Sequence, residues 1–250
     1  MKIVVTNDDG PHTPVLEPVV KALEERGHAV VVVVPERQRS ATGLARTYHK
    51  PLRARKIGRY YLVNGFPTDA VFLALNLIAP DAELVVSGIN IGENIGFEST
   101  YGSGTVAAAI QAGVLGRVGL AVSMEPGADL GKALSLLSAF VEALDGYRRD
   151  GLLAVSVNLP EGWSGRLASP RSLAVGLYAE RLYKFVDPRG EEFYWRWGPR
   201  REEFPRDTDA YAFYAERAAT AVGICAEGVC QVEDLVRRTS EIINGSRRRP

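Results

Sequence analysis

The 250-residue sequence is poor in cysteine, carries no net charge and lacks any long apolar run. Its two cysteines, Cys225 and Cys230, form neither a CxxC pair nor a zinc-ligand spacing, which excludes a disulfide-rich scaffold. We expect both thiols to be reduced. No apolar stretch approaches the roughly 20 residues that span a bilayer, and the first residues lack the apolar core of a secretory signal. These absences predict a cytoplasmic protein with no membrane partner.

The charge balance also bears on possible partners. Thirty basic residues match thirty acidic ones, so the chain has no excess charge with which to attract nucleic-acid polymers or a membrane surface. The hydrophobic share of 46% and charged share of 24% are ordinary for a globular protein. The length suits a core with an appendage. We expect a catalytic core over residues 1–160 and an extension over 161–250 that packs on the core and on a partner subunit.

Strand and helix signals alternate through the first part of the chain. Predicted strands cover Lys2–Thr6, Val30–Val34, Leu84–Val86, Leu120–Ser123 and Leu153–Asn158. Predicted helices cover Pro14–Arg26, a segment capped by Thr68 that runs to Ile78, Thr105–Leu115 and Leu130–Leu144. This alternation predicts an α/β fold with a doubly wound, mostly parallel, Rossmann-like sheet. In such sheets the ligand site lies beyond the carboxyl ends of the strands.

The pattern changes after about residue 160. Arg181–Arg206 mixes aromatic residues with charges of both signs, and Gln231–Ile243 reads as a helix. We interpret the first segment as a β-hairpin arm that, with the terminal helix, serves oligomerisation. Aromatics interleaved with arginine also suit a nucleic-acid surface. The acids of this stretch would repel phosphates and favour the arm: Asp187, Glu191, Glu192, Glu202 and Glu203.

The most informative motif is Asn7-Asp8-Asp9-Gly10, which follows the first strand directly. Two adjacent carboxylates repel each other, and burying both is costly unless a cation neutralises them. Carboxylate oxygens suit a hard cation such as Mg²⁺ or Mn²⁺. The structural alternative is a turn in which an aspartate caps the next helix. The position of the NDDG motif at a strand end favours the metal site over the capped turn.

Three further segments lie at strand ends or at a helix start. Arg37–Gly43 follows the second strand, Ser87–Asn94 follows a later strand, and Tyr101–Thr105 opens an alanine-rich helix. Serine, threonine and glycine at such places favour anion binding, and asparagine adds neutral oxygens. Each segment alone could be a solvated loop, a plain turn or an ordinary helix cap. Together they predict a metal centre beside a phosphate cradle, the apparatus of metal-assisted phosphoryl hydrolysis.

These motifs together resemble one known family. The quoted segments are TNDDG, VVPERQRSATG, PTDAV, VVSGINIGEN, SGTVAAA and SVNLP. They resemble the stationary-phase survival protein family, SurE, chiefly over residues 3–110. The resemblance implies a metal-dependent nucleotidase that releases phosphate from nucleoside 5′-, and often 3′-, monophosphates. It also implies a homodimer or homotetramer that exchanges C-terminal segments between subunits.

The resemblance assigns roles to particular residues. The implied ligands of the divalent cation are Asp8, Asp9, Ser40 and Asn90, of which Asp8, Asp9 and Asn90 are the implied catalytic residues. The implied phosphate-side residues are Gly43, Asn94, Ser103, Gly104 and Thr105. The expected mechanism is in-line attack by a metal-activated water.

The chain departs from the family pattern in two places. Gly102 separates Tyr101 from Ser103, where the family runs directly from Tyr or His to Ser, which puts the placing of this loop in question. The stretch Ala218–Cys225 stands where the family carries EGYVSITPLH, and no histidine follows it. The general acid is therefore unassigned. A catalytically impaired protein that binds nucleotide or metal remains the alternative function.

Two other protein classes also place acids after the first strand. A nucleoside N-ribohydrolase needs a D-x-D-x-x-x-D-D pattern, whereas this chain has only the single pair of Asp8 and Asp9. A receiver-type signalling module needs a phosphoacceptor aspartate at a third strand end, and no aspartate ends a central strand here. His12 lies two residues past the NDDG turn, and we expect it to be a loop residue without a role.

Overall fold

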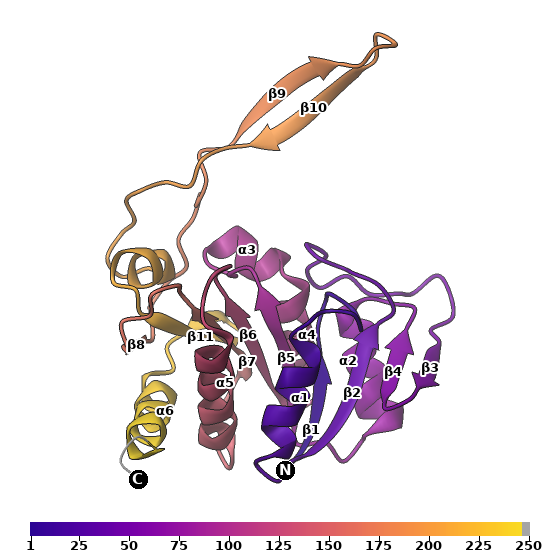
Figure 1. Ribbon diagram of the computed structural model, residues 1–250, viewed down its shortest axis with the longest axis vertical. Coiled ribbons are helices and arrows are strands. Elements are labelled where there is room, and N and C mark those ends of the chain that lie inside the picture. The colour runs from indigo at the N-terminus through magenta and orange to yellow at the C-terminus, as the bar shows by residue number, and fades with distance from the viewer. Residues whose placement is uncertain (247–250) are drawn as a thin grey trace.

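A computed structural model describes residues 1–246 of the chain (Figure 1). Its main sheet has the strand order β12-β11-β7-β6-β5-β1-β2-β4-β3, and β8 joins it through β11. The strands of this sheet are β1 Lys2–Thr6, β2 Ala29–Pro35, β3 Ala54–Ile57, β4 Tyr60–Val63, β5 Leu84–Ile91, β6 Val118–Met124, β7 Leu152–Leu159, β8 Leu167–Ala168, β11 Ala219–Cys225 and β12 Gly228–Cys230. A separate hairpin pairs β9 Arg181–Val186 with β10 Glu192–Trp197.

Helices cover both faces of the sheet. They are α1 Leu16–Glu24, α2 Pro67–Leu73 with its wider continuation η1 Ala74–Ile78, α3 Phe97–Gly102, α4 Gly104–Val114, α5 Leu130–Leu144, η2 Tyr211–Ala215 and α6 Glu233–Ser246. Figure 1 shows α1 and α5 in front of the sheet. Strand alternation divides the core accordingly. Ile3 and Val5 pack toward α1 and α5, whereas Val4 packs toward α2 and α4.

The expected α/β architecture is confirmed. Strands β4, β2, β1, β5, β6 and β7 run parallel to their neighbours in this order, and β11 is antiparallel to β7. Because parallel strands end at one edge, the loops after β1, β2, β5 and β6 leave the sheet together. β5 extends beyond its expected end at Val86, through the SGIN motif to Ile91. Its register with β6 shifts between Gly88 and Asn90.

The expected cap at Thr68 is wrong. The helix begins at Pro67, so Thr68 already lies inside its first turn, where its hydroxyl donates to the Ala45 carbonyl. The capping side chain is Asp69, whose Oδ2 accepts from the backbone N of Phe66 at 2.8 Å. A carboxylate in the first turn can reach back to the uncapped amide, which satisfies a donor that the helix leaves open.

The C-terminal region completes the sheet and then leaves it. Strands β11 and β12 extend the main sheet beyond β7, and α6 packs beside α5. Between these pieces the β9–β10 hairpin projects away from the body (Figure 1). The expected hairpin arm and terminal helix are therefore present. The division into a core of 1–160 and an extension of 161–250 stays a prediction.

The expectation of reduced cysteines is also wrong. Cys225 and Cys230 form a disulfide, with their Cα atoms 6.0 Å apart. The cause is the tight hairpin between β11 and β12, in which Cys225 pairs with Gly228 and Gly223 pairs with Cys230. This antiparallel pairing brings the two side chains together, although their spacing in the sequence matches no common redox motif.

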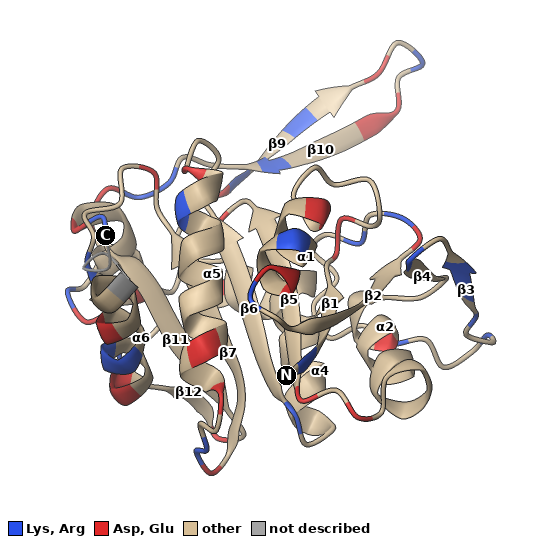
Figure 2. Cartoon of the chain, turned by 60° about the horizontal axis from the view of Figure 1, so that its bottom comes forward, with Lys and Arg blue, Asp and Glu red and all other residues tan. Residues whose placement is uncertain are grey.

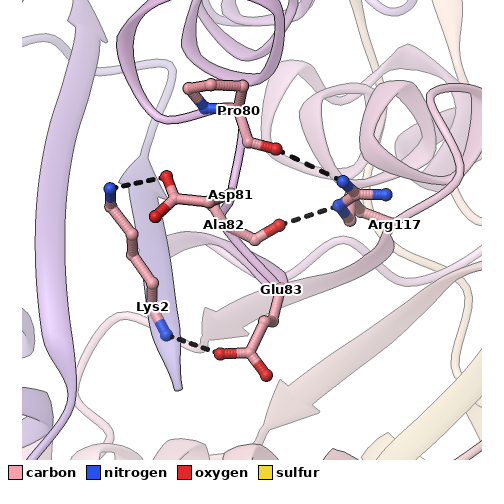
Figure 3. A network of polar contacts seen from close by, with 6 residues as sticks. All are labelled: Lys2, Pro80, Asp81, Ala82, Glu83 and Arg117. Atoms are coloured by element: carbon pink, nitrogen blue, oxygen red, sulfur yellow. Dashed lines mark hydrogen bonds and ion pairs between the residues drawn. The ribbon is translucent and has the colours of Figure 1, made fainter.

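The amino ends of the strands form the opposite edge of the sheet. There Lys2 holds two acids, with its Nζ 2.6 Å from Asp81 Oδ1 and its backbone N donating to Glu83 Oε1 at 2.9 Å (Figure 3). Arg117 donates from Nε to the Ala82 carbonyl at 2.8 Å and also bonds the Pro80 carbonyl. These contacts fix the turn that leads into β5.

The surface mixes charges of both signs. Figure 2 shows basic and acidic residues together on α5, on α6 and on the β9–β10 hairpin. This distribution agrees with the balanced composition and lends no support to a polyelectrolyte partner. Within residues 1–246 no helix is long and apolar enough to cross a membrane. The cytoplasmic location stays a prediction.

Candidate active site

The NDDG segment is a rigid turn at the carboxyl end of β1. The Asn7 side chain closes it twice: Oδ1 accepts from the Gly10 backbone N at 2.8 Å, and Nδ2 donates to the Gly10 carbonyl at 3.0 Å. Asn7 is buried, so both bonds are shielded from water. An asparagine bonded to backbone a few residues on is the usual way to stabilise such a turn. The turn holds Asp8 and Asp9 just beyond the strand.

Asp8 is fixed by contacts from two other segments. Its Oδ1 accepts from the Thr105 hydroxyl at 2.6 Å, and its backbone carbonyl accepts from the Arg39 backbone N at 2.6 Å. The side chain is 4% exposed. Burial raises the pKa of the Asp8 carboxyl above its ordinary value, and the bond from Thr105 opposes that rise. Thr105 therefore contacts the first acid directly.

Asp9 lies nearer to solvent and is joined to Ser40 through Gln38. Burial raises the pKa of the Asp9 carboxyl, the negative charge of Asp8 raises it further, and a hydrogen bond from Gln38 opposes both. The Gln38 amide also donates to Ser40 Oγ at 3.1 Å. Gln38 was missed by the sequence analysis, although it stands inside the Arg37–Gly43 motif. Within residues 1–246 neither acid of the NDDG turn forms an ion pair.

Gly104 allows the helix α4 to approach the acids closely. A Cβ placed on Gly104 would lie 2.8 Å from the Cβ of Asp8 and 3.1 Å from the Arg39 carbonyl oxygen. Real Cβ atoms do not approach that closely, so only glycine fits. The side chain of Ser103 caps the helix, with Oγ accepting from the Val106 backbone N at 3.2 Å. The start of α4, where backbone N–H groups favour an anion, therefore lies against Asp8.

Gly43 ties the loop after β2 to the same place. Its backbone N donates to the Gly102 carbonyl at 2.8 Å, and its φ is +51°. A Cβ there would lie 2.9 Å from the Tyr101 carbonyl oxygen. The additional Gly102 therefore leaves the loop in contact with its neighbours. Ser103 still caps α4 and Thr105 still reaches Asp8.

The two asparagines lie along the same edge, after β5. Asn90 donates from Nδ2 to the Gly92 carbonyl at 2.7 Å, and its Oδ1 accepts no hydrogen bond among residues 1–246. Asn94 donates from Nδ2 to Ser123 Oγ at 2.8 Å and from its backbone N to Asn158 Oδ1 at 2.7 Å. Neither asparagine bonds an acid of the NDDG turn in the described part of the chain. Asn158 belongs to the SVNLP motif, whose pattern predicted no role for this residue.

The available donor groups fit a hard divalent cation. Among residues 1–246 no three His, Cys, Asp or Glu residues gather into a metal-binding group. The site instead offers two carboxylates with hydroxyl and amide oxygens, which are the ligands that Mg²⁺ and Mn²⁺ prefer. The hydroxyls of Thr6 and Ser87, which pair across β1 and β5, are buried and have no hydrogen-bond partner in the described part of the chain. Two carboxylates without an ion pair, beside hydroxyl and amide oxygens, mark a polar site that a ligand would complete.

Comparisons with known proteins agree with this site. The family model described as Survival protein SurE matches residues 3–178. The 5′-nucleotidase SurE 2 of Pyrobaculum aerophilum is 62% identical over 244 residues, covering 97% of each chain. The 5′-nucleotidase SurE of Thermococcus kodakarensis is 38% identical and covers 90% of this chain and 92% of its own. The crystal structure of the SurE protein from Aquifex aeolicus matches with a TM-score of 0.78 at 28% identity, covering 90% of this chain and 93% of its own. This chain belongs to the SurE family.

Proposed function

We propose that the protein is a metal-dependent 5′-nucleotidase, which hydrolyses nucleoside 5′-monophosphates to nucleoside and phosphate. One observation carries the proposal: Thr105 and Gly104 hold the amino end of α4 against Asp8, which forms no ion pair among residues 1–246. That contact places an anion-binding helix end beside carboxylates that attract a cation. The relatives named as 5′-nucleotidases, one of them 62% identical, support the choice of substrate.

Four residues would hold the cation. Asp8 and Asp9 supply charged oxygens, Ser40 a hydroxyl and Asn90 its amide oxygen. When bound, Mg²⁺ or Mn²⁺ neutralises phosphate charge and lowers the pKa of water. The carboxyls of Asp8 and Asp9 would also accept the proton of the attacking water, and Thr105 orients the first of them.

The phosphate side is formed by residues that donate hydrogen bonds. Ser103 and the backbone N–H groups that begin α4 would bind the non-bridging oxygens, with Gly43 allowing the close approach of the loop. Asn94 would add its contact from the neighbouring loop. The stretch Ala218–Cys225, which replaces the family's histidine block, forms strand β11 from Ala219 onward and presents no acid to this site. The alternative proposal, a binding protein without turnover, rests on that replacement.

Phosphate release from a panel of nucleoside 5′- and 3′-monophosphates tests the function. Parallel assays would contain EDTA, Mg²⁺ or Mn²⁺, with Asp9→Asn as the site variant and Asp81→Asn as a matched acid-to-amide control at the other sheet edge. We expect metal-dependent release that Asp9→Asn abolishes and Asp81→Asn retains. Release that survives EDTA would contradict the metal proposal. Nucleotide binding without release would favour the alternative.

We also propose that the hairpin arm docks on a second copy of the chain. The β9–β10 hairpin exposes large apolar side chains, with Leu182 69%, Trp195 63% and Trp197 61% exposed. Exposed aromatics on a projecting segment are typical of a protein interface. Light scattering would report a dimer or tetramer for the full chain. A monomer at micromolar concentration would contradict this proposal without affecting the catalytic one.

A further inference from the structure

The loop that carries Asn94 is attached to the C-terminal region as well as to the sheet. Ile95 is 1% exposed and packs in an apolar cluster with Ala174, Leu177, Ala210 and Phe213. The Phe97 backbone N donates to the Ala174 carbonyl at 2.8 Å. Residues that are more than seventy positions later in the chain therefore cover the outer side of the loop. Its position depends on them, because loops without such contacts open easily.

Asp209 is a buried polar residue in the C-terminal segments that pack over this loop. Its Oδ2 accepts from the Gly96 backbone N at 2.7 Å, and its Oδ1 accepts from the backbone N of Ala174 and of Ala210 at 2.8 Å. The side chain is 1% exposed. Burial raises the pKa of the Asp209 carboxyl, which the three N–H donors oppose. One carboxylate thus joins the loop after β5 to two segments of the extension.

A second contact fixes the residue that precedes Asn94. The Tyr214 hydroxyl donates to Glu93 Oε1 at 2.9 Å, and the Arg200 guanidinium lies 3.8 Å from the centre of the Tyr214 ring. Burial and the nearby Glu93 charge raise the pKa of Tyr214, so its hydroxyl remains a donor at neutral pH. Tyr214 and Asp209 therefore hold the loop on both sides of Asn94, through Glu93 and Gly96.

The inner side of the loop is held by the sheet. Ser123 and Asn158, at the ends of β6 and β7, bond the side chain and the backbone of Asn94. The loop that carries Asn94 is therefore held from two directions, by the sheet and by the C-terminal region. Small displacements of a substrate-binding group weaken its contact with the substrate, so such supporting contacts affect substrate binding.

We propose that Asp209, assisted by Tyr214, is a positioning residue that holds Asn94 at the phosphate side of the active site. The inference rests on the nucleotidase function proposed above. It predicts that a substitution which removes the Asp209 contacts weakens phosphate binding while the protein remains folded. The rest of the site, including the contacts of Asp8, should be unaffected, because none of its bonds involves Asp209.

The test compares Asp209→Asn with Asp207→Asn. Asp207 is exposed, and its side chain makes no hydrogen bond or ion pair within the described residues, so the same chemical change there is a matched control. For Asp209→Asn we expect KM for a 5′-nucleotide, and the inhibition constant of orthophosphate, to rise about tenfold to a hundredfold with a smaller change in kcat. Hydrogen exchange in the 92–100 segment should accelerate. Asp207→Asn should match the unaltered chain in all three.

Unchanged KM, orthophosphate inhibition and exchange in a folded Asp209→Asn variant would overturn the proposal. Should that variant fail to fold, Tyr214→Phe removes the hydroxyl that contacts Glu93 and Arg200, and it must show the same shifts at smaller size for the proposal to stand. A full-length protein that releases no phosphate would instead disprove the nucleotidase function. In that case exchange of the 92–100 segment and orthophosphate binding by calorimetry still test the positioning role.

Discussion

The acidic residues at the two edges of the central sheet differ in their ion pairing and in the direction of their pKa shifts. At the amino edge Asp81 and Glu83 are exposed and both bond Lys2, and the bond from Lys2 lowers the pKa of Asp81 (Figure 3). At the carboxyl edge Asp8 is buried and Asp9 is half-buried, and neither forms an ion pair among residues 1–246. Burial raises the pKa of both. Lys2 thus compensates the charge of the two acids at the amino edge. The charge of Asp8 and Asp9 is what a bound cation would neutralise.

The largest effect should come from removing charge at the carboxyl edge. We expect Asp8→Asn to lower kcat/KM for a 5′-nucleotide at least about a thousandfold, since a cation ligand contributes several kcal/mol to the transition state. Initial rates at saturating Mg²⁺ or Mn²⁺ would measure it. Full turnover in the variant would show that Asp8 is not a metal ligand. The acids at the two edges would then not differ in function.

A steric change at the same edge should have a smaller effect. Gly104→Ala places a Cβ against Asp8 and the Arg39 carbonyl, so it must shift the start of α4. We expect a loss of about tenfold to a hundredfold in kcat/KM. Gly102→Ala is the matched control, because a Cβ there meets nothing within 4 Å. Equal activity of both variants would show that the close approach of α4 is unimportant.

The same Asp8→Asn change should act on stability in the opposite direction. Without a cation it removes a buried charge beside Asp9, so we expect the free energy of unfolding to rise by about 1 kcal/mol. Added Mg²⁺ should raise the Tm of the original chain and leave the variant unchanged, because only a bound ligand stabilises the folded state. Thermal unfolding with and without metal measures both. Destabilisation of the metal-free variant would contradict the comparison.

The smallest effect should come from removing the charge of an acid at the amino edge. Asp81→Asn breaks an exposed pair with Lys2, so we expect Tm to fall by less than about 2 °C. Because the bond lowers the folded-state pKa of Asp81, the pair stabilises the protein above pH about 4 and loses its effect as the pH falls through the lowered value. The Tm difference between the two proteins should vanish at acid pH and in high salt. A difference that persists there would mean that Asp81 has a further role.

Local patterns in the sequence predicted much of the fold and part of the site. The run Val30–Val34 and the other short apolar segments were confirmed as strands, since burial on both faces demands a continuous apolar stretch. The NDDG turn and the glycine at 104 were also recognisable, because their residue types permit few other structures. Thr68 failed as a cap because a neighbouring carboxylate, Asp69, competes for the same amide. Several side chains near a helix start can satisfy one donor.

The sequence by itself determined which residue types follow which strand. Acids follow the first strand, and hydroxyl residues and glycines follow the others. Only the tertiary structure decided which groups meet. Thr105 bonds Asp8 across 97 positions, and Gly96 bonds Asp209 across 113. A buried carboxylate that accepts backbone N–H groups leaves no residue pattern around it, because every residue except proline offers that donor. The Cys225–Cys230 bridge likewise depends on a backbone pairing, that of β11 with β12, and the spacing of the cysteines does not predict it.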